Sequence, residues 1–254
     1  MIIAHIFTFC VVFERFFIKH SKKLCDITNL PIVNILGSID NKIECLANIN
    51  KQIECLANME YTKIFADRDT FSPLSKIAVM KSGFAFKSDW WTNKGIPVIK
   101  IANIDSSLNM KGCSFVSEDK LDLAKEFIAN PGDIVLAMTG ATLGKFCIIP
   151  KHDGVYLVNQ RVGKFFIKPN NLPLLFCSLK SKEVSEAIIN LASGSAQPNI
   201  SANDINLLNI KYNENLANKF NEKYNLFFKK IINNVSLIQK LNELKQLYLK
   251  KFFN

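Results

Sequence analysis

Two long amphipathic stretches constrain the fold of this chain more than any other feature of its sequence. In residues 33–66, apolar side chains recur at intervals of three or four positions or near multiples, with charged and amide side chains between them. Residues 213–254 repeat this pattern, with lysines and asparagines opposite the apolar stripe. This spacing matches the period of an α-helix that has one apolar face. The sequence therefore predicts two long helices, one on each side of the residues between them.

The first of these stretches contains an internal repeat. Ile43–Asn48 recurs identically as Ile53–Asn58, an offset of ten residues that is close to three helical turns. Both copies would present Ile and Leu on roughly one face, as in a coiled coil or a partner helix. Asn50 would then occupy a polar core position that could set the register. An ordinary amphipathic helix packed on a core explains the pattern nearly as well, and both interpretations stay open.

The residues between the two stretches have the pattern of a separate domain, which we place at 67–212. Short apolar segments alternate there with turn residues, which suits a mixed α/β domain with a strongly bent sheet. The segments expected to form strands are Pro97–Ile101, Ile134–Met138, Phe146–Ile149 and Val162–Ile167. Residues 172–193 are expected to be helical, and an exit strand is expected to begin at Asp204. The predicted fold class is α+β: one mixed α/β domain flanked by two long amphipathic, coiled-coil-like helices.

The first 32 residues differ in character from the rest of the chain. The apolar run at the start reaches its first carboxylate at Glu14, which makes it too short to span a bilayer. It also lacks the basic start and the small-residue cleavage site of a secretory signal. Asp26–Ile32 is similar to Asp204–Ile210, and each segment precedes a long amphipathic stretch. We interpret 1–32 as the remnant of a preceding domain, followed by one complete repeat. A membrane anchor is the less favoured alternative.

The composition favours a polyanionic partner. The formal net charge of +10 comes from 32 Lys+Arg against 22 Asp+Glu, and it suits nucleic acid or an anionic membrane surface. A lysine-rich surface that serves only solubility would give the same balance. The seven cysteines form no Cys-x-x-Cys pair, which indicates reduced thiols in a cytoplasmic protein. The three histidines lie far apart, so we expect no metal site.

A glycine-spaced loop at 139–145 joins two of the expected strands. Its glycines let backbone N–H groups approach a ligand closely. A nucleotide-binding phosphate loop needs four residues between its glycines and Ser or Thr after the lysine. Here three residues separate Gly140 from Gly144, and Phe146 follows Lys145. The sequence also contains no Asn/Asp-Pro-Pro-aromatic motif for base methylation and no nucleophile elbow. We therefore expect no catalysis and no cofactor.

Several segments together resemble one protein family. Their order and spacing are similar to those of the target-recognition domain in the DNA specificity subunit of Type I restriction–modification systems. The segments are Gly83–Ser88, Gly95–Ile104, Gly132–Lys145, Val158–Arg161 and Gly194–Ser201. Asn34–Glu44 resembles the start of the spacer helix of that family, so 33–66 and 213–254 would be the two spacer helices.

The resemblance implies a non-catalytic subunit that reads DNA. Members of this family carry two recognition domains, held apart by two long antiparallel helices, and each domain reads one half of a bipartite site. Methyltransferase subunits dock beside the helices, and restriction subunits join to cut unmethylated DNA. This chain has only one complete recognition domain. It is therefore expected to be a half-subunit that forms a homodimer or pairs with another half, or else the remnant of a truncated gene. An assembly protein that binds no DNA is a further alternative.

The resemblance also suggests which residues contact double-stranded DNA. Lysines in the family-like segments would position phosphates, while amides and arginine could read base edges. The candidates are Lys87, Lys100, Asn103, Thr139, Thr142, Lys145, Asn159, Gln160, Arg161, Ser195 and Gln197. Against this, Gly140, Gly194 and Asn159 could chiefly hold the fold. Trp90 and Trp91 could be core anchors instead of groove contacts.

Overall fold

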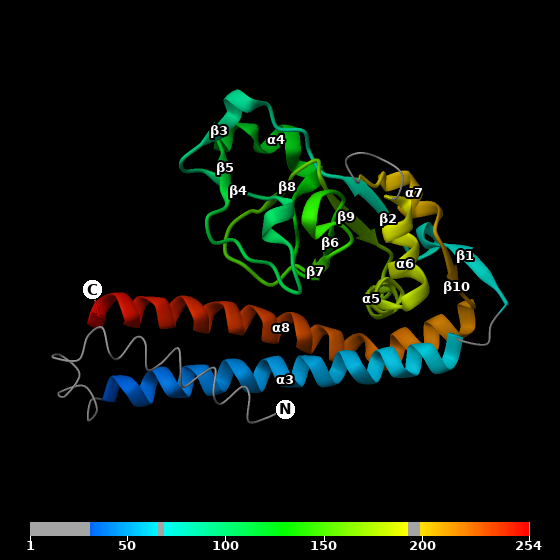
Figure 1. Ribbon diagram of the computed structural model, residues 1–254, viewed down its shortest axis with the longest axis horizontal. Coiled ribbons are helices and arrows are strands. Elements are labelled where there is room, and N and C mark those ends of the chain that lie inside the picture. The colour runs from blue at the N-terminus through cyan, green and yellow to red at the C-terminus, as the bar shows by residue number, and fades with distance from the viewer. Residues whose placement is uncertain (1–30, 66–68, 193–198, 254) are drawn as a thin grey trace. The chain divides into compact units, whose positions relative to one another are not determined.

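The computed structural model describes residues 31–65, 69–192 and 199–253 (Figure 1). These residues fall into two compact units. The larger comprises Ala47–Leu237, and the smaller combines residues up to Leu46 with Ile238–Asn254. The fold class expected from the sequence is confirmed, because the chain has a mixed α/β domain and two long helices, α3 (Pro31–Phe65) and α8 (Glu214–Phe253). Within the described residues, neither these helices nor any other is long and apolar enough to cross a membrane.

Both long helices carry the expected end signals. Pro31 stands at the first position of α3, where its fixed φ suits the helix and its missing N–H costs nothing. The side chain of Asn213 caps α8 by accepting a hydrogen bond from the N–H of Leu216 at 3.1 Å. Glu214 lies in the first turn of α8, and Lys250 lies in its last turn, so both charges complement the helix dipole.

In the larger unit, α3 and α8 pair in antiparallel fashion. Glu60 accepts hydrogen bonds from the Tyr224 hydroxyl at 2.7 Å and from the Lys223 ammonium at 2.5 Å. Further along, Asn234 donates its side-chain amide to Asn50 at 2.7 Å, and both side chains are buried. Asn50 therefore lies between two helices, as the sequence indicated, and its partner belongs to the same chain.

In the smaller unit, the ends of α3 and α8 also pair. Lys245 donates to both carboxylate oxygens of Asp40, at 2.6 and 2.8 Å. Ile32, Ile39 and Leu46 are the buried apolar residues of α3 in this unit. Their spacing of seven residues follows one face of the helix, so the apolar stripe seen in the sequence is at least partly covered within the chain.

The domain between the helices contains two four-stranded sheets and one two-stranded ladder. The first sheet is wholly antiparallel and has the order β2 (Ala78–Ser82), β9 (Val162–Ile167), β6 (Ile134–Ala137), β7 (Phe146–Ile148). The second has the order β3 (Trp91–Thr92), β5 (Ser114–Val116), β4 (Ile96–Ile99), β8 (Leu157–Val158), with β4 and β8 parallel. The ladder pairs β1 (Phe71–Pro73) with β10 (Asn209–Lys211).

Short helices complete the domain. The region expected to be helical forms α5 (Leu172–Lys180) and α6 (Lys182–Leu191). Ser181 ends the first and caps the second, accepting from the N–H of Val184. A single turn, α4 (Leu121–Ala124), precedes β6. Turns of 3-10 helix lie at Leu74–Lys76, Ser88–Trp90, Ile101–Asn103, Glu118–Lys120, Lys125–Phe127 and Gly140–Thr142.

The exit strand expected at Asp204 was a wrong prediction. Residues there form a helix, α7 (Ala202–Leu207), and β10 begins only at Asn209. Ser201 caps α7 by accepting from the N–H of Asp204 at 3.1 Å, an interaction that favours a helix start. The helix has a clear role, because Asn206 uses its amide to pair with both backbone groups of Met80, at 2.7 and 2.9 Å. It therefore covers part of the free edge of β2.

The main core of the larger unit joins the first sheet to the helices. It contains buried side chains from β2, β6 and β9 together with those of α3, α5, α7 and α8, and Phe65, Phe165, Phe220 and Phe228 are among its largest members. A second core combines residues of the first sheet, such as Val135 and Val162, with Ile99 and Val158 of the second sheet. A third lies on the second sheet and the segments beside it. Burial of large apolar side chains contributes about 1.5–3 kcal/mol each to folding, so these helices and the sheet stabilise one another.

Thiol reactivity offers a test of this packing. Burial raises the pKa of Cys147 and of Cys177 to about 12, whereas the side chains of Cys45 and Cys55 are exposed on α3. Because the thiolate is the reacting species, we expect the buried pair to alkylate roughly a thousandfold more slowly at pH 8. Peptide mass spectrometry after timed treatment with iodoacetamide measures this. All four should react alike in denaturant, and equal rates in the folded protein would contradict the packing.

Candidate nucleic-acid interface

Four loops meet at one end of the strand pair β6–β9. They comprise residues 83–88, 99–105, 138–145 and 158–161, and we call them the loop cluster. Backbone hydrogen bonds tie them together: the N–H of Asn159 donates to Ile99 at 3.0 Å, and that of Met138 donates to Arg161 at 3.0 Å. The N–H of Gln160 donates to Phe84 at 2.9 Å. Segments far apart in the sequence thus form one connected surface.

Gly83 allows the closest of these approaches. A Cβ atom at this position would lie 2.4 Å from the carbonyl oxygens of both Val158 and Asn159. The backbone cannot move away easily, because the N–H of Gly83 donates to Val162 at 2.9 Å and that of Phe84 donates to Val158 at 2.8 Å. Only glycine fits between these two chain segments.

The glycine-spaced loop between β6 and β7 is held against the turn that follows β4. Gly140 has φ +77°, a left-handed conformation that favours glycine. The hydroxyl of Thr142 donates to the carbonyl of Ile101 at 3.1 Å. The Lys145 ammonium contacts the Asp105 carboxylate at 2.8 Å, and both side chains are largely exposed. Hydrogen bonding to Lys145 holds the pKa of Asp105 below its usual range.

The candidate DNA-contacting residues differ in exposure. Lys87, Lys145, Gln160 and Arg161 are exposed in the loop cluster, whereas Lys100, Thr139, Thr142 and Asn159 are half-buried. Asn159 also accepts a hydrogen bond from the N–H of Arg161 at 3.3 Å, which shapes the loop. Ser195 and Gln197 lie outside the described residues, although Asn199 forms a bridge to Thr139.

Lys100 and Asn103 belong to the fold rather than to an open surface. The Lys100 ammonium donates to Ser114 at 2.8 Å and lies 3.7 Å from the centre of the Trp91 ring. Asn103 is 7% exposed; its side-chain oxygen accepts from the N–H of Lys100 and its amide donates to Asn109. Both side chains therefore hold the turn after β4 in place, and a contact of either with DNA stays a prediction.

Sequence reasoning missed Lys120 beside this surface. Its ammonium lies 5.2 Å from the centre of the Trp90 ring, and that of Lys87 lies 5.6 Å from it. Trp90 is half-buried, stacks on Phe84 and packs against the core of the second sheet. No sequence motif surrounds Lys120, and only the fold brings it to Trp90.

The described residues contain no group of three or more His, Cys, Asp or Glu side chains that could hold a metal ion. As described above, the loop cluster offers hydrogen-bond donors, exposed cations and the exposed ion pair of Lys145 and Asp105. Such a surface can position phosphates and contact base edges.

Comparison with known proteins identifies the family. The family of the Type I restriction modification DNA specificity domain matches residues 70–246, and the chain belongs to it. The chain is 31% identical over 144 residues to the Type I restriction enzyme MjaVIII specificity subunit of Methanocaldococcus jannaschii, covering 54% of this chain and 33% of that protein. It is 32% identical over 96 residues to the EcoAI specificity subunit of Escherichia coli, covering 36% of this chain and 16% of that protein.

A solved structure has a similar fold. The S subunit of the Type I restriction–modification system from M. genitalium matches with a TM-score of 0.56 at 20% sequence identity, over 88% of this chain and 60% of that one. In the two sequence comparisons, with the MjaVIII and EcoAI subunits, the matched regions span a third or less of those proteins. The family and the fold predicted from the sequence are confirmed.

Proposed function

We propose that this chain is the DNA-reading, non-catalytic part of a Type I restriction–modification complex. It would direct methyltransferase and restriction subunits to a bipartite site in double-stranded DNA, in the cytoplasm. Membership of the specificity-domain family supports this. The observation that carries it furthest is the convergence of family-like segments at the loop cluster, where Lys87, Lys145, Gln160 and Arg161 are exposed together.

The loop cluster would read DNA through two kinds of contact. Lys87 and Lys145 would neutralise phosphates, which gives affinity without sequence information. Gln160 and Arg161 carry side chains that can form paired hydrogen bonds with the edges of adenine and guanine. The backbone bonds that hold this loop, such as that from Gln160 to Phe84, would reduce the entropy lost on binding.

A bipartite site needs a second recognition domain. We propose that a second copy of this chain, or a different half-subunit, supplies it and that the helices α3 and α8 contribute the spacer and the surface for the methyltransferase. Among the described residues, one mixed α/β domain lies between α3 and α8. The domain boundaries 1–32, 33–66, 67–212 and 213–254 remain part of this proposal.

The test is DNA binding by the complex of this chain with its methyltransferase subunits. We expect the triple variant Lys145→Ala, Gln160→Ala, Arg161→Ala to lose about a hundredfold in affinity for the cognate site. Removal of Lys145 from phosphate contact would also lower the salt slope of the binding constant by about one. Fluorescence anisotropy of labelled duplexes at several salt concentrations measures both. Lys182→Ala, on the exposed face of α6, is the matched control.

Other outcomes would support the alternatives. Methylation that survives the triple substitution would favour an assembly protein that binds no DNA. Aggregation of the wild-type chain even with its methyltransferase partner would indicate an inactive remnant. Genome-wide methylation mapping with and without the gene distinguishes a palindromic bipartite motif, expected for a homodimer, from an asymmetric one, expected for two different halves.

The ion pair between Asp105 and Lys145 predicts a gain of affinity. If Lys145 contacts a phosphate, the exposed Asp105 carboxylate competes for the ammonium and repels the DNA backbone. We expect Asp105→Asn to tighten binding about threefold to tenfold at low salt, with a smaller gain at high salt. The same anisotropy titration measures this. Glu186→Gln, which removes an exposed carboxylate on α6, should have no effect, and weaker binding by Asp105→Asn would contradict the proposed role of Lys145.

A further inference from the structure

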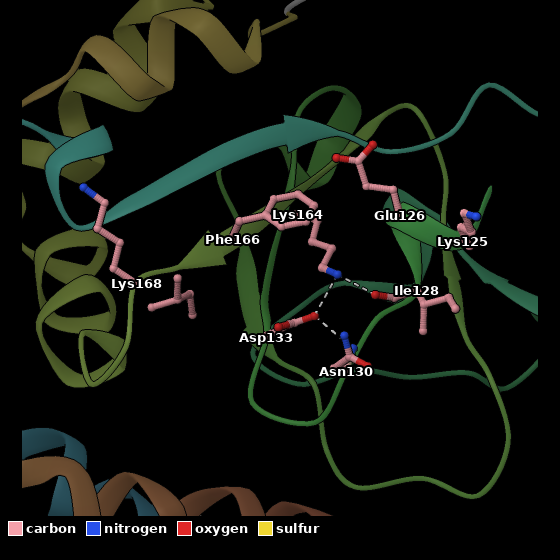
Figure 2. A pocket seen from close by; sticks show the side chains of 9 residues that line it. Lys125, Glu126, Ile128, Asn130, Asp133, Lys164, Phe166 and Lys168 are labelled. Atoms are coloured by element: carbon pink, nitrogen blue, oxygen red, sulfur yellow. Dashed lines mark hydrogen bonds and ion pairs between the residues drawn. The ribbon is translucent and has the colours of Figure 1, made fainter. Parts of the chain in front are cut away.

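A second polar site lies at the other end of the β6–β9 strand pair. It is a pocket of about 450 Å³ that includes Lys125, Asp133, Lys164 and Lys168 in its lining (Figure 2). Asp133 precedes β6 and Lys168 follows β9. Two segments of the loop cluster, 138–145 and 158–161, lie at the opposite ends of these strands. The six residues of β9 span about 20 Å. The pocket is therefore separate from the loop cluster.

A buried ammonium forms the floor of this pocket. Lys164 is 4% exposed, and its Nζ donates to the carbonyl of Ile128 at 2.5 Å and contacts Asp133 at 3.1 Å (Figure 2). It also lies 4.7 Å from the centre of the Phe166 ring. Asp133 in turn accepts from the N–H of Asn130 at 2.9 Å. A lysine is rarely buried without such partners, so this side chain has a fixed position.

The charges around the pocket do not cancel. Asp133 is neutralised by Lys164, and Glu126 forms an ion pair with Lys81. Lys125 and Lys168 are exposed and have no ion-pair partner among the described residues. Figure 2 shows their side chains on either side of Lys164. The lining thus carries three lysines against two carboxylates, and this excess of positive charge attracts an anion.

We propose that this pocket binds a phosphate group. The ammonium groups of Lys125 and Lys168 would contact its oxygens directly, and the Asn130 amide at the rim would supply a further donor. The buried Lys164–Asp133 pair would give the pocket its shape. A free anion such as phosphate or pyrophosphate and a backbone phosphate of DNA offer the same chemistry, so the source is decided by experiment. The proposal does not depend on DNA reading by the loop cluster.

The test uses the full chain and three probes: inorganic phosphate, pyrophosphate and duplex DNA, each at constant ionic strength. Lysine acetylation followed by peptide mass spectrometry reports each ammonium separately. We expect a saturating probe to slow the modification of Lys125 and Lys168 at least fivefold, while Lys182 on α6 stays unchanged. Calorimetry should show that Lys125→Ala/Lys168→Ala binds the effective probe at least about tenfold more weakly. Lys182→Ala should bind like the wild type.

The outcomes separate the two sources. Protection by phosphate or pyrophosphate identifies a free-anion site, and protection by DNA alone identifies a backbone contact. A duplex that binds tightly without protecting these lysines leaves DNA reading by the loop cluster intact and excludes the backbone contact. The proposal is overturned if none of the probes protects Lys125 and Lys168, with phosphate tested up to about 20 mM. It is also overturned if the double variant binds the effective probe as the wild type does.

Discussion

Gly83→Ala should destabilise the domain by about 2–4 kcal/mol, because the new Cβ would collide with two carbonyl oxygens at 2.4 Å. The loop that contains Val158 and Asn159 would have to move. This movement breaks the hydrogen bond from the N–H of Phe84 to Val158 and the one from the N–H of Gln160 to Phe84. For a chain of this length the melting temperature should fall by about 5–15 °C. Chemical denaturation followed by circular dichroism measures the loss.

A glycine in open space provides the control for this variant. Gly37 lies within α3, and nothing stands within 4 Å of the Cβ that alanine would add. Gly37→Ala should therefore raise the stability by about 0.5–1 kcal/mol through helix propensity. We also expect Gly83→Ala to bind DNA more weakly, because Asn159 and Gln160 would be displaced with the loop. Wild-type stability in Gly83→Ala would show that the two segments are not packed as closely as described.

The second large effect is expected at the buried amide pair of α3 and α8. Asn50 is 7% exposed and Asn234 is 3% exposed, and each amide is the partner of the other at 2.7 Å. Asn234→Ala would leave the oxygen of Asn50 buried without a donor and would open a small cavity. We expect a loss of about 2–4 kcal/mol in the free energy of unfolding. Urea denaturation gives this value.

Replacing both members of the pair should have the opposite sign. Asn50→Leu/Asn234→Leu removes both polar groups at once, so the stability should equal or exceed that of the wild type. The double variant should instead lose specificity in how α3 and α8 pair. In the wild type, any other register would bury one of the two amides against apolar side chains without a partner. Analytical ultracentrifugation should then show self-association. Asn48→Ala, an exposed change on α3, is the control. A single variant as stable as the wild type would contradict the pairing.

Periodicity predicted the long elements of this protein well. The stripes in 33–66 and 213–254 extend over many turns, so the helical period is clear, and α3 and α8 lie within two residues of these bounds. Asn50 could be placed in a helix interface because one amide interrupts an otherwise apolar stripe. Its partner could not be named, since a stripe does not reveal which surface will cover it.

Short elements and buried polar groups were beyond the reach of sequence reasoning. The apolar residues around Ile205 suit a strand as well as a helix, and the cap provided by Ser201 decides for α7. Asn103 looks like a surface amide until the carbonyl of Asn109 and the N–H of Lys100 are placed beside it. Lys164 reads as an outward residue of a strand, yet Ile128 and Asp133 enclose it from a distant part of the chain.

The ladder of β1 and β10 has a consequence for the exchange of recognition modules. It pairs the first strand after α3 with the last strand before α8, with Ser72 opposite Ile210. A foreign domain whose own ends lie equally close could replace residues 74–208 and leave this junction unchanged. The contacts between α3 and α8 would be kept, whereas the new domain would have to replace the packing of the first sheet and α5 against both helices. Under the proposed function, a chimera that retains Phe71–Pro73 and Asn209–Lys211 is the natural starting point for changing the DNA target.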